Sequence, residues 1–428
     1  MNPANDFGTK AARARIYLVV AHALQHILAA ALPVLLVFIR QEMNLSFTDM
    51  GVILAAGNLV AGVAQFPAGL LVDRLGAKNM LVGGYALTLG GLLMFAQAQT
   101  IPAMLIARMV SGLGNATFHP ASFPEMAVAS RPTGLSMGMA LHNVGGNVGM
   151  SAGYFITGVL AASLGWRTSL AWMVYAGIAL SVFFALTYPR LPAEDAVDQP
   201  ADQDGQAKDD KVAAQSKGES RESLVGQWAP TIILAAAAAL SGAFGWSITS
   251  FLPTFLTDTK GLTAVVAGAF STIMLASGTL GSLIGGRAGD KFDRSQIVLL
   301  ATIASTLLVV ALAWAPVGSI GLAALLVLLG IGHSIPRPSM NAITAEIAPA
   351  GRSGGAFGLV FGAMSLGGSL ASPLVGYIAD IASMSTAFMV IGVCFLLHGI
   401  VIRRIYASRI SPTSGSRSDT RSNREAAG

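Results

Sequence analysis

Long apolar runs, separated by short polar breaks, make up most of this chain. Each run holds about 18 residues or more, the length that a helix needs to cross a hydrocarbon core about 30 Å thick. Because lipid offers no hydrogen bonds, each run must satisfy its own backbone polar groups, which a helix does. The pattern therefore predicts twelve membrane-spanning helices, at roughly residues 16–39, 47–72, 79–98, 101–122, 133–162, 167–188, 228–256, 262–287, 295–314, 317–346, 352–379 and 385–403.

Two polar stretches fall outside these runs. Residues 190–226 carry many acidic and basic side chains and few large apolar ones, so they cannot bury a core. Residues 405–428 are rich in Ser and Arg. We therefore expect an N-terminal six-helix bundle over 1–189, a flexible cytoplasmic linker over 190–226, a C-terminal six-helix bundle over 227–404 and a disordered cytoplasmic tail over 405–428.

Composition narrows the class of protein. The chain is 54% hydrophobic and 11% charged, whereas soluble domains carry about 25% charged residues, so a soluble globular protein is excluded. Cys394 is the single cysteine, which rules out an internal disulfide and a thiolate metal site. No phosphate-binding Walker loop and no enzyme signature is present. We expect a protein that is not an enzyme and needs no cofactor.

Basic residues indicate orientation and partners. The formal net charge is +5, but Lys and Arg lie at span ends and in the tail rather than in one patch, which argues against a nucleic-acid partner. One side of the predicted bundle collects most of them, and the other collects Arg40, Arg167 and Lys260. Because basic loops stay in the cytoplasm, we expect both termini inside.

A short charged turn occurs twice. The first copy runs from Gly69 to Lys78 and the second from Gly286 to Arg294. Other pairs share an offset of about 217–220 residues, among them Pro120 with Pro338. The chain therefore reads as two parallel six-span repeats, a pattern typical of one transporter architecture. The candidate gating residues of the two turns are Gly69, Asp73, Arg74, Gly76, Lys78, Gly286, Asp290, Lys291 and Arg294.

These motifs resemble those of the major facilitator superfamily. The first turn matches the superfamily's loop motif between spans two and three, and Arg108 to Gly114 matches its motif in span four. Phe118-His119-Pro120 and Val144 to Gly149 resemble the fosmidomycin-resistance group of efflux proteins. The resemblance implies a bacterial inner-membrane transporter that works as a monomer, with spans one, four, seven and ten around a central cavity.

One departure from that group bears on coupling. Its members typically follow the span-four proline with Glu-Gly-Ser-Arg, whereas this chain has Ala121-Ser-Phe-Pro124-Glu125. The acidic residue best suited to carry a proton is therefore displaced. The resemblance leaves the coupling mechanism open.

The charged turns have two interpretations. As a gate, an ionic latch holds the cytoplasmic ends together in the outward-open state and breaks in the inward-open state. In that role Asp73 accepts hydrogen bonds from a neighbouring helix N-terminus, whose dipole favours an anion. As a topology anchor, the turn does not switch. The recurrence in both halves favours the gate, with the first copy as the stronger determinant because Asp293 replaces the closing glycine in the second.

Ionisable residues within spans form stripes. Such groups are expensive in lipid and usually face a cavity or a partner. Helical spacing puts His22 and His26 on one face of span one. The same spacing puts Arg108, Asn115 and His119 on one face of span four, and His333 with Arg337 on span ten. In the repeat alignment Asn115 corresponds to His333, and His119 to Arg337.

These stripes favour an anionic small-molecule substrate. Guanidinium groups bind carboxylate or phosphate through two hydrogen bonds, and acids are scarce within the spans. The alternative is that Arg108 and Arg337 serve packing. We expect Trp246 to form either an apolar wall of the site or part of a helix interface.

Histidine suits proton transfer near neutral pH. His119 and His26 are the first candidates for proton coupling, followed by Glu125; uncoupled diffusion or exchange is the alternative. No metal site is expected, because the i, i+4 pair His22 and His26 has no third ligand identifiable from sequence.

Span five carries Gly145, Gly146, Gly149 and Gly153, which permit close helix packing. We expect their partner to be span eleven of the other half. Taken together, the sequence predicts a proton-coupled efflux transporter of a small anionic drug or metabolite, working by alternating access in the lipid bilayer. The alternatives are proton-coupled uptake of an organic acid and a non-transporting receptor or scaffold.

Overall fold

The computed structural model describes residues 3–130, 135–189, 191, 224–316, 318–349 and 353–410, and these residues are almost entirely helical. In the N-terminal half the helices are α1 (Pro3–Met43), α2 (Phe47–Leu75), α3 (Ala77–Gln97), α4 (Ile101–Ser130), α5 (Leu135–Leu164) and α6 (Trp166–Thr187). In the C-terminal half they are α8 (Leu224–Asp258), α9 (Ala264–Lys291), α10 (Arg294–Trp314), α11 (Ser319–Ser334), α12 (Pro336–Ile347), α13 (Ser353–Ile381) and α14 (Met384–Ile410).

The prediction of an all-α membrane protein is confirmed. Eleven helical segments of the described chain are long and apolar enough to cross a membrane. The remaining predicted span is α4, a helix of 30 residues whose polar stripe lowers its hydropathy. Predicted span ten appears as two helices, α11 and α12, that meet at Ile335. Pro336 and Pro338 follow at once and remove two amide donors from the helical ladder.

Element ends differ most from the prediction in three places, one of which is α4, which continues past residue 122 to Ser130. Helix α1 begins at Pro3, ahead of the apolar run, and α14 continues to Ile410, so residues 405–410 of the expected tail are helical. The rest of that tail lies outside the described residues. So does the expected linker, apart from Leu191 and the residues 224–226 that open α8.

The repeat is visible in the turns. The α1–α2 turn places Asn44 at φ 53, and the α8–α9 turn places Gly261 at φ 68. Ser46 then caps α2 and Thr263 caps α9, each accepting a hydrogen bond from a backbone N–H of the first helical turn. These pairs keep the offset of 217 found in the sequence, so the two halves share local backbone geometry.

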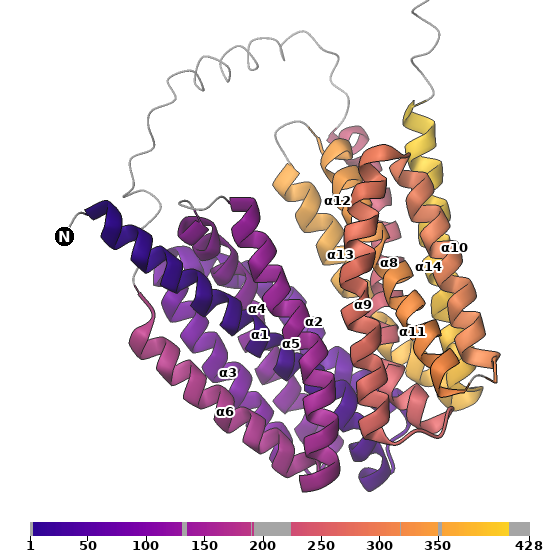
Figure 1. Cartoon of the computed structure of the whole chain (residues 1–428), viewed down its shortest axis with the longest axis horizontal. Coiled ribbons are helices and arrows are strands. Elements are labelled where there is room, and N and C mark those ends of the chain that lie inside the picture. Colours follow the sequence, from indigo (N-terminus) through magenta and orange to yellow (C-terminus); the bar gives the residue numbers. More distant parts are fainter. Residues whose placement is uncertain are drawn as a thin grey trace, which may run out of the picture.

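Each half packs in the same way. Helix α1 lies against α5, and α8 lies against α13; between the halves, α2 packs on α13 and α5 packs on α9. Figure 1 shows the two bundles side by side, the first in indigo to magenta and the second in salmon to yellow. We call the end of the bundle that carries Gly76 and Asp293 the charged-turn end, and the other the opposite end.

Contacts between the halves gather at the opposite end. A Cβ on Gly51 would lie 2.3 Å from the carbonyl oxygen of Ser372, and one on Gly376 would lie 2.1 Å from that of Phe47. The carboxylate of Asp380 accepts hydrogen bonds from the first two backbone N–H groups of α2, each at 2.8 Å. Arg40 forms an ion pair with Asp258 across the same seam. The opposite end is therefore closed.

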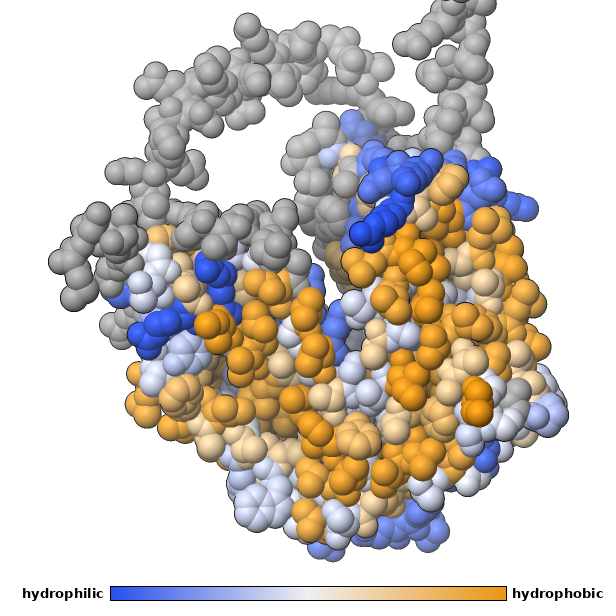
Figure 2. Space-filling model, viewed as in Figure 1, coloured by the Kyte–Doolittle hydropathy of each residue, from blue (hydrophilic) through white to orange (hydrophobic). Residues whose placement is uncertain are grey.

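The outer surface fits a bilayer. Large apolar side chains such as Ile16, Leu186 and Ile320 are exposed, and Figure 2 shows orange, apolar residues around the middle of the molecule with blue ones toward both ends. Figure 2 also shows a hollow between the two halves, lined by paler and bluer residues than the flanks. An apolar belt with a polar interior is the arrangement expected when lipid replaces water as the solvent.

Candidate functional site

Four histidines of the N-terminal half meet at its centre. His22 and His26 come from α1, His119 from α4 and His142 from α5. The ring of His22 stacks on that of His142 with centroids 4.1 Å apart, and lies 4.7 Å from that of His26 and 5.5 Å from that of His119. The first three were predicted to face the cavity, and the structure brings them together.

Hydrogen bonds fix the protons of two of these rings. His22 Nδ1 lies 2.7 Å from the backbone carbonyl of His142, and a carbonyl only accepts, so Nδ1 carries the hydrogen. In the neutral ring, His22 Nε2 is then the acceptor, and it receives its hydrogen bond from His26 Nε2 at 3.0 Å. The Nδ1 atoms of His26, His119 and His142 are buried without a protein partner. The cluster thus combines a defined chain of hydrogen bonds with spare ring nitrogens.

Glycines of α5 make room for this cluster. A Cβ on Gly146 would lie 2.7 Å from the His22 ring, and one on Gly149 would lie 2.1 Å from the carbonyl oxygen of Ala23. The expectation that these glycines pack on span eleven was wrong, because they face α1 of their own half. A stripe of small residues shows that a close neighbour exists but does not say which helix it is.

Asn115 and Arg108 lie on α4 apart from the histidines. Asn115 accepts a hydrogen bond of 2.5 Å from Gln25 of α1. Arg108 lies across Gly57 of α2, and its Nη1 donates to the Ser111 hydroxyl at 3.1 Å. Its Nε is buried without a partner, so the guanidinium is only partly satisfied.

The C-terminal half holds a different pair. Arg337 Nη2 donates to His333 Nε2 at 3.0 Å, which leaves the hydrogen of the neutral His333 ring on Nδ1. That Nδ1 is buried without a partner among the described residues, and the ring lies beside the stacked pair of Phe244 and Phe395. Arg337 itself is exposed, although it sits at the junction of α11 and α12 within a membrane-spanning segment. A solvent-accessible arginine at that depth requires a polar cavity.

Trp246 lies on α8 near this pair. Its indole covers Gly368 of α13, where a Cβ would meet the ring at 2.3 Å, and the side chain is 40% exposed. Its neighbour Gly245 approaches the His333 ring, with a Cβ-to-Cε1 distance of 3.0 Å. Trp246 therefore offers an apolar face next to the His333–Arg337 pair.

Two other candidates stand apart from these clusters. Glu125 accepts a hydrogen bond from the Tyr188 hydroxyl at 2.8 Å, toward the charged-turn end. Burial, with the neighbouring carboxylate, raises the pKa of Tyr188 above its usual value. His398 is fully buried and its Nδ1 donates to the carbonyl of Ala237 at 2.8 Å, as a structural histidine does.

The first charged turn makes contacts within its own half. Gly76 ends α2 at φ 81, in the left-handed region that glycine adopts without strain. Lys78 donates to the backbone carbonyl of Tyr188 at 3.4 Å, while Arg74 is exposed and Gly69 touches Pro120. The side chain of Asp73 lies outside the described part of the structure, so its expected cap is not tested.

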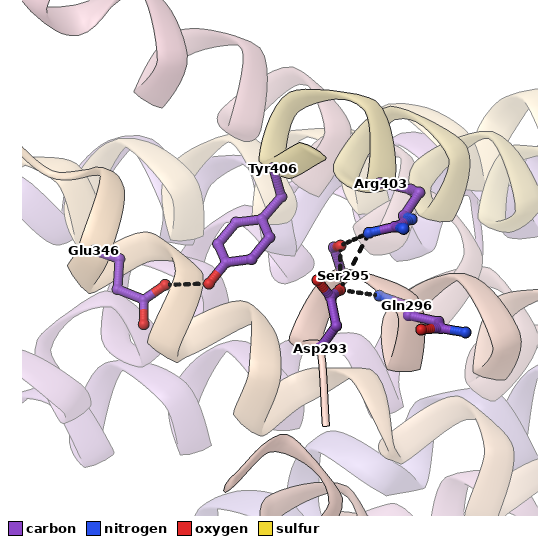
Figure 3. A network of polar contacts seen from close by, with 6 residues as sticks. All are labelled: Asp293, Ser295, Gln296, Glu346, Arg403 and Tyr406. Atoms are coloured by element: carbon purple, nitrogen blue, oxygen red, sulfur yellow. Dashed lines mark hydrogen bonds and ion pairs between the residues drawn. The ribbon is translucent and has the colours of Figure 1, made fainter. Parts of the chain in front are cut away.

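The second turn belongs to a wider network, drawn in Figure 3. Asp293 caps α10 by accepting from the Gln296 N–H at 2.8 Å, and it pairs with Arg403 of α14 at 3.3 Å. Tyr406 of α14 donates to Glu346 of α12 at 2.8 Å. Glu346 also pairs with Arg294, which Figure 3 does not draw. Gly286, Asp290 and Lys291 complete the turn on α9, the latter two exposed.

The environment of Asp293 lowers its pKa. Burial acts to raise it, but the hydrogen bonds from Ser295 and Gln296 and the charge of Arg403 outweigh burial. The residue that replaces the closing glycine of the first turn therefore ties α10 to α14.

Some residues of these clusters were missed from the sequence. His142 and Phe123 were not among the candidate residues, and Phe118 entered only as part of a motif; in the structure Phe118 stacks on His22 and Phe123 on His119. The signal for His142 is three-dimensional, because its partner His22 lies 120 residues away. Arg403 and Tyr406 at the end of the last span were likewise not recognised as partners of the second turn.

Comparisons with known proteins agree with this architecture. A family model described as Major Facilitator Superfamily matches residues 18–319 and 234–426. The chain is similar to the fosmidomycin resistance protein of Escherichia coli, with 26% identity over 391 residues, 89% of this chain and 90% of that protein. It is also similar to a probable nitrate transporter of Staphylococcus epidermidis, with 26% identity over 365 residues, 82% and 85% of the two chains.

Solved structures share the fold. A bacterial homolog of the human lysosomal transporter Spinster, in an inward-facing and unoccupied conformation, superposes with a TM-score of 0.76 at 15% identity, covering 96% of this chain and 98% of that one. The nucleoside transporter NupG superposes with a TM-score of 0.70 at 16% identity, covering 92% and 99%.

Proposed function

The chain belongs to the major facilitator superfamily and is a multi-pass membrane transporter, and on this premise we propose that it couples proton movement to export of a small anionic drug or metabolite. The observation that carries the proposal is the pairing of two unlike polar centres at matched positions. The histidine cluster lies in one half, and the His333–Arg337 pair lies in the other.

The anion is assigned to the C-terminal centre. Arg337 is permanently charged and exposed, and within the described part of the chain its hydrogen-bond partner is the neutral His333 ring. An uncompensated guanidinium in a membrane interior is stabilised by a bound anion. Trp246 supplies an apolar face for the rest of the substrate. Arg108, whose Nε lacks a partner among the described residues, is a second positive group, about three helical turns along α4 from His119.

The proton is assigned to the N-terminal centre. Histidine takes up and releases protons near neutral pH, and His26, His22 and the carbonyl of His142 form a continuous chain of hydrogen bonds. His119 adds an unpartnered ring nitrogen. Glu125 is a further proton acceptor, held by Tyr188 toward the charged-turn end. His22 and His26 lie on α1, and His119 and Glu125 lie on α4. Proton uptake therefore acts on two helices that line the proposed substrate path.

Direction has two candidates. Similarity to a fosmidomycin resistance protein favours export, and similarity to a probable nitrate transporter favours uptake of a small anion, including an organic acid, by proton symport. The same fold supports both, because rocking of the two halves exposes the site to either side. A receptor or scaffold role has no need of charged side chains within the spans, which are expensive there.

Transport in proteoliposomes tests the proposal. We expect purified protein to move fosmidomycin or nitrate at a rate set by an imposed pH gradient, with loss of that dependence on addition of a protonophore. Arg337→Gln should abolish the flux, while the control Arg404→Gln, at an exposed arginine of α14, should preserve it. Flux that ignores the pH gradient would remove proton coupling, and unchanged flux in Arg337→Gln would make that arginine structural.

The charged turns serve the same cycle as an inner gate. Asp380 and the Arg40–Asp258 pair close the opposite end. In this proposal the charged-turn end is the open one. It faces the cytoplasmic side of a bacterial inner membrane, and both termini lie on that side. Asp73→Asn should change how long the inner side stays open, measured by cysteine labelling from each side. Labelling identical to that of the wild type would make the turn a topology anchor.

A further inference from the structure

Three histidine rings of the N-terminal half converge in a way that proton transfer does not require. One ligand atom from each of His22, His26 and His119 lies within 4.8 Å of the others. His22 and His26 are four residues apart on α1, and His119 enters from α4. The i, i+4 spacing gives two ligands from one helix face, and the crossing helix supplies the third ligand that sequence alone does not identify.

The distances between the ring nitrogens are close to those between the ligand atoms of a metal site. With metal–nitrogen bonds of about 2.0–2.1 Å in tetrahedral geometry, two ligand nitrogens stand about 3.3 Å apart. The Nε2 atoms of His22 and His26 are 3.0 Å apart. Both become free to bind an ion when the hydrogen of the neutral His26 ring moves from Nε2 to Nδ1. One ligand nitrogen of the half-buried His119 lies within 4.8 Å of those of the other two rings, and rotation of its side chain is the movement that would close this separation.

A second observation points the same way. Metal-binding histidines usually donate their other ring N–H to a carbonyl or carboxylate, which fixes the tautomer and aims the free nitrogen at the metal. His22 does this, because Nδ1 donates to the carbonyl of His142 at 2.7 Å and Nε2 faces His26. Gly146 leaves the space in which the His22 ring holds that position.

The surroundings complete the description of the site. Phe118 stacks on His22 and Phe123 stacks on His119, so apolar rings flank two of the three candidate ligands and limit access of water on those sides. The three candidate ligand groups, all within the described part of the chain, are neutral imidazoles, a set that suits zinc, copper, nickel and iron rather than calcium or magnesium.

From this geometry we infer that His22, His26 and His119 form a binding site for one divalent first-row transition-metal ion, of which Zn²⁺ is the type. Three protein ligands leave the fourth position of a tetrahedral ion open to water or to an anion. The inference goes beyond the proposed function and does not rest on it, because binding of the ion needs neither transport nor a proton gradient.

Cobalt substitution tests the site directly. Detergent-purified protein without a polyhistidine tag is titrated with Co²⁺, and the visible absorption is recorded. We expect one Co²⁺ per chain with the intense bands of four-coordinate cobalt, displaced by Zn²⁺ at the same stoichiometry. Pale six-coordinate spectra alone, or no saturable binding, would overturn the inference.

Variants locate the ion. His26→Ala and His119→Ala should each weaken Zn²⁺ binding, measured by calorimetry, by more than the about 10–100-fold that loss of an outer-shell partner costs. The control His398→Ala removes a buried histidine of the other half, bonded to Ala237, and should leave binding unchanged. Equal affinity in all variants would place the ion elsewhere and contradict the site. If an alanine variant does not fold, the wild-type cobalt spectrum still decides.

Discussion

The two halves of this transporter share a backbone plan and differ in the chemistry at its centre. Asn115 and His119 on α4 correspond to His333 and Arg337 on α11 and α12. In the first half neutral rings bond to one another and to a carbonyl. In the second, a permanent cation bonds to one ring and is open to solvent. The shared backbone plan fits a duplicated scaffold, and different residues at matched positions give its two centres different polar chemistry.

The largest expected effect comes from erasing that difference. Arg337→His gives the second half the residue that the first half has at the matched position. Because a hydrogen bond to a charged group contributes about 1.5–3 kcal/mol, affinity for nitrate or fosmidomycin at pH 8 should fall about 10–100-fold in a calorimetric titration.

The charge-preserving Arg337→Lys separates charge from geometry. It should lose less affinity than Arg337→His, because the ammonium remains although the planar fork is gone. If Arg337→His binds the anion as tightly as the wild type, the assignment of the anion to the C-terminal centre is contradicted.

The second prediction concerns a feature that both halves share, a glycine where two helices pack closely. A Cβ on Gly149 would lie 2.1 Å from the carbonyl oxygen of Ala23, and one on Gly367 would lie 2.2 Å from that of Ala239. Backbone atoms cannot move aside cheaply, so Gly149→Ala and Gly367→Ala should each destabilise the fold by about 1–3 kcal/mol. Thermal unfolding in detergent measures both.

Gly62→Ala serves as the control, since a Cβ there meets nothing within 4 Å. Its unfolding temperature should match or exceed that of the wild type. A large loss of thermal stability in only one of Gly149→Ala and Gly367→Ala would show that the helix pairs α1–α5 and α8–α13 are not equivalent.

The sequence predicted the scaffold better than the centres. Apolar runs and the repeat offset were sufficient for the fold, because lipid permits few alternatives to helices. The stripe spacing correctly joined His22 to His26 and His333 to Arg337, which are local pairs on single helices. It did not find His142, whose contact with His22 depends on how α5 crosses α1. The glycines of α5 were assigned to the wrong neighbour for the same reason.

The third prediction concerns an unequal contribution to closure. Asp380 of the second half accepts hydrogen bonds from Phe47 and Thr48 at the start of α2. The corresponding end of α5 has Ala162 and Ser163, at offsets of 218 and 217, and the Ser163 hydroxyl donates to carbonyls of its own helix. A carboxylate at a helix N-terminus contributes about 0.3–1 kcal/mol when exposed.

Asp380→Ala should therefore change the ratio of opposite-end-open to opposite-end-closed molecules by up to about fivefold. Cysteine accessibility from the opposite side measures the ratio. Ser163→Ala is the matched control and should leave it unchanged. An equal shift in both variants would mean that closure is not anchored by the second half.

The smallest effect comes from removing charge alone at the charged turns, where the first half has Gly76 without a side-chain cap and the second has Asp293 with one. Asp293→Ala removes the cap and the pair with Arg403, and should lower the free energy of unfolding by about 1 kcal/mol. Asp293→Asn keeps a capping oxygen and removes the charge, so it should cost only the value of an exposed ion pair, about 0.2–1 kcal/mol.

The pH dependence separates these two contributions. The pKa of Asp293 in the folded protein lies below its unfolded value, so its charge stabilises the fold above the unfolded pKa of about 3.9. That stabilisation is lost as the pH falls through the folded pKa. The gap in thermal stability between the wild type and Asp293→Asn should therefore be constant from about pH 5 to pH 7 and shrink below about pH 4. A gap that does not change with pH would assign the role of Asp293 to capping alone, and the two turns would then differ in local helix geometry rather than in charge.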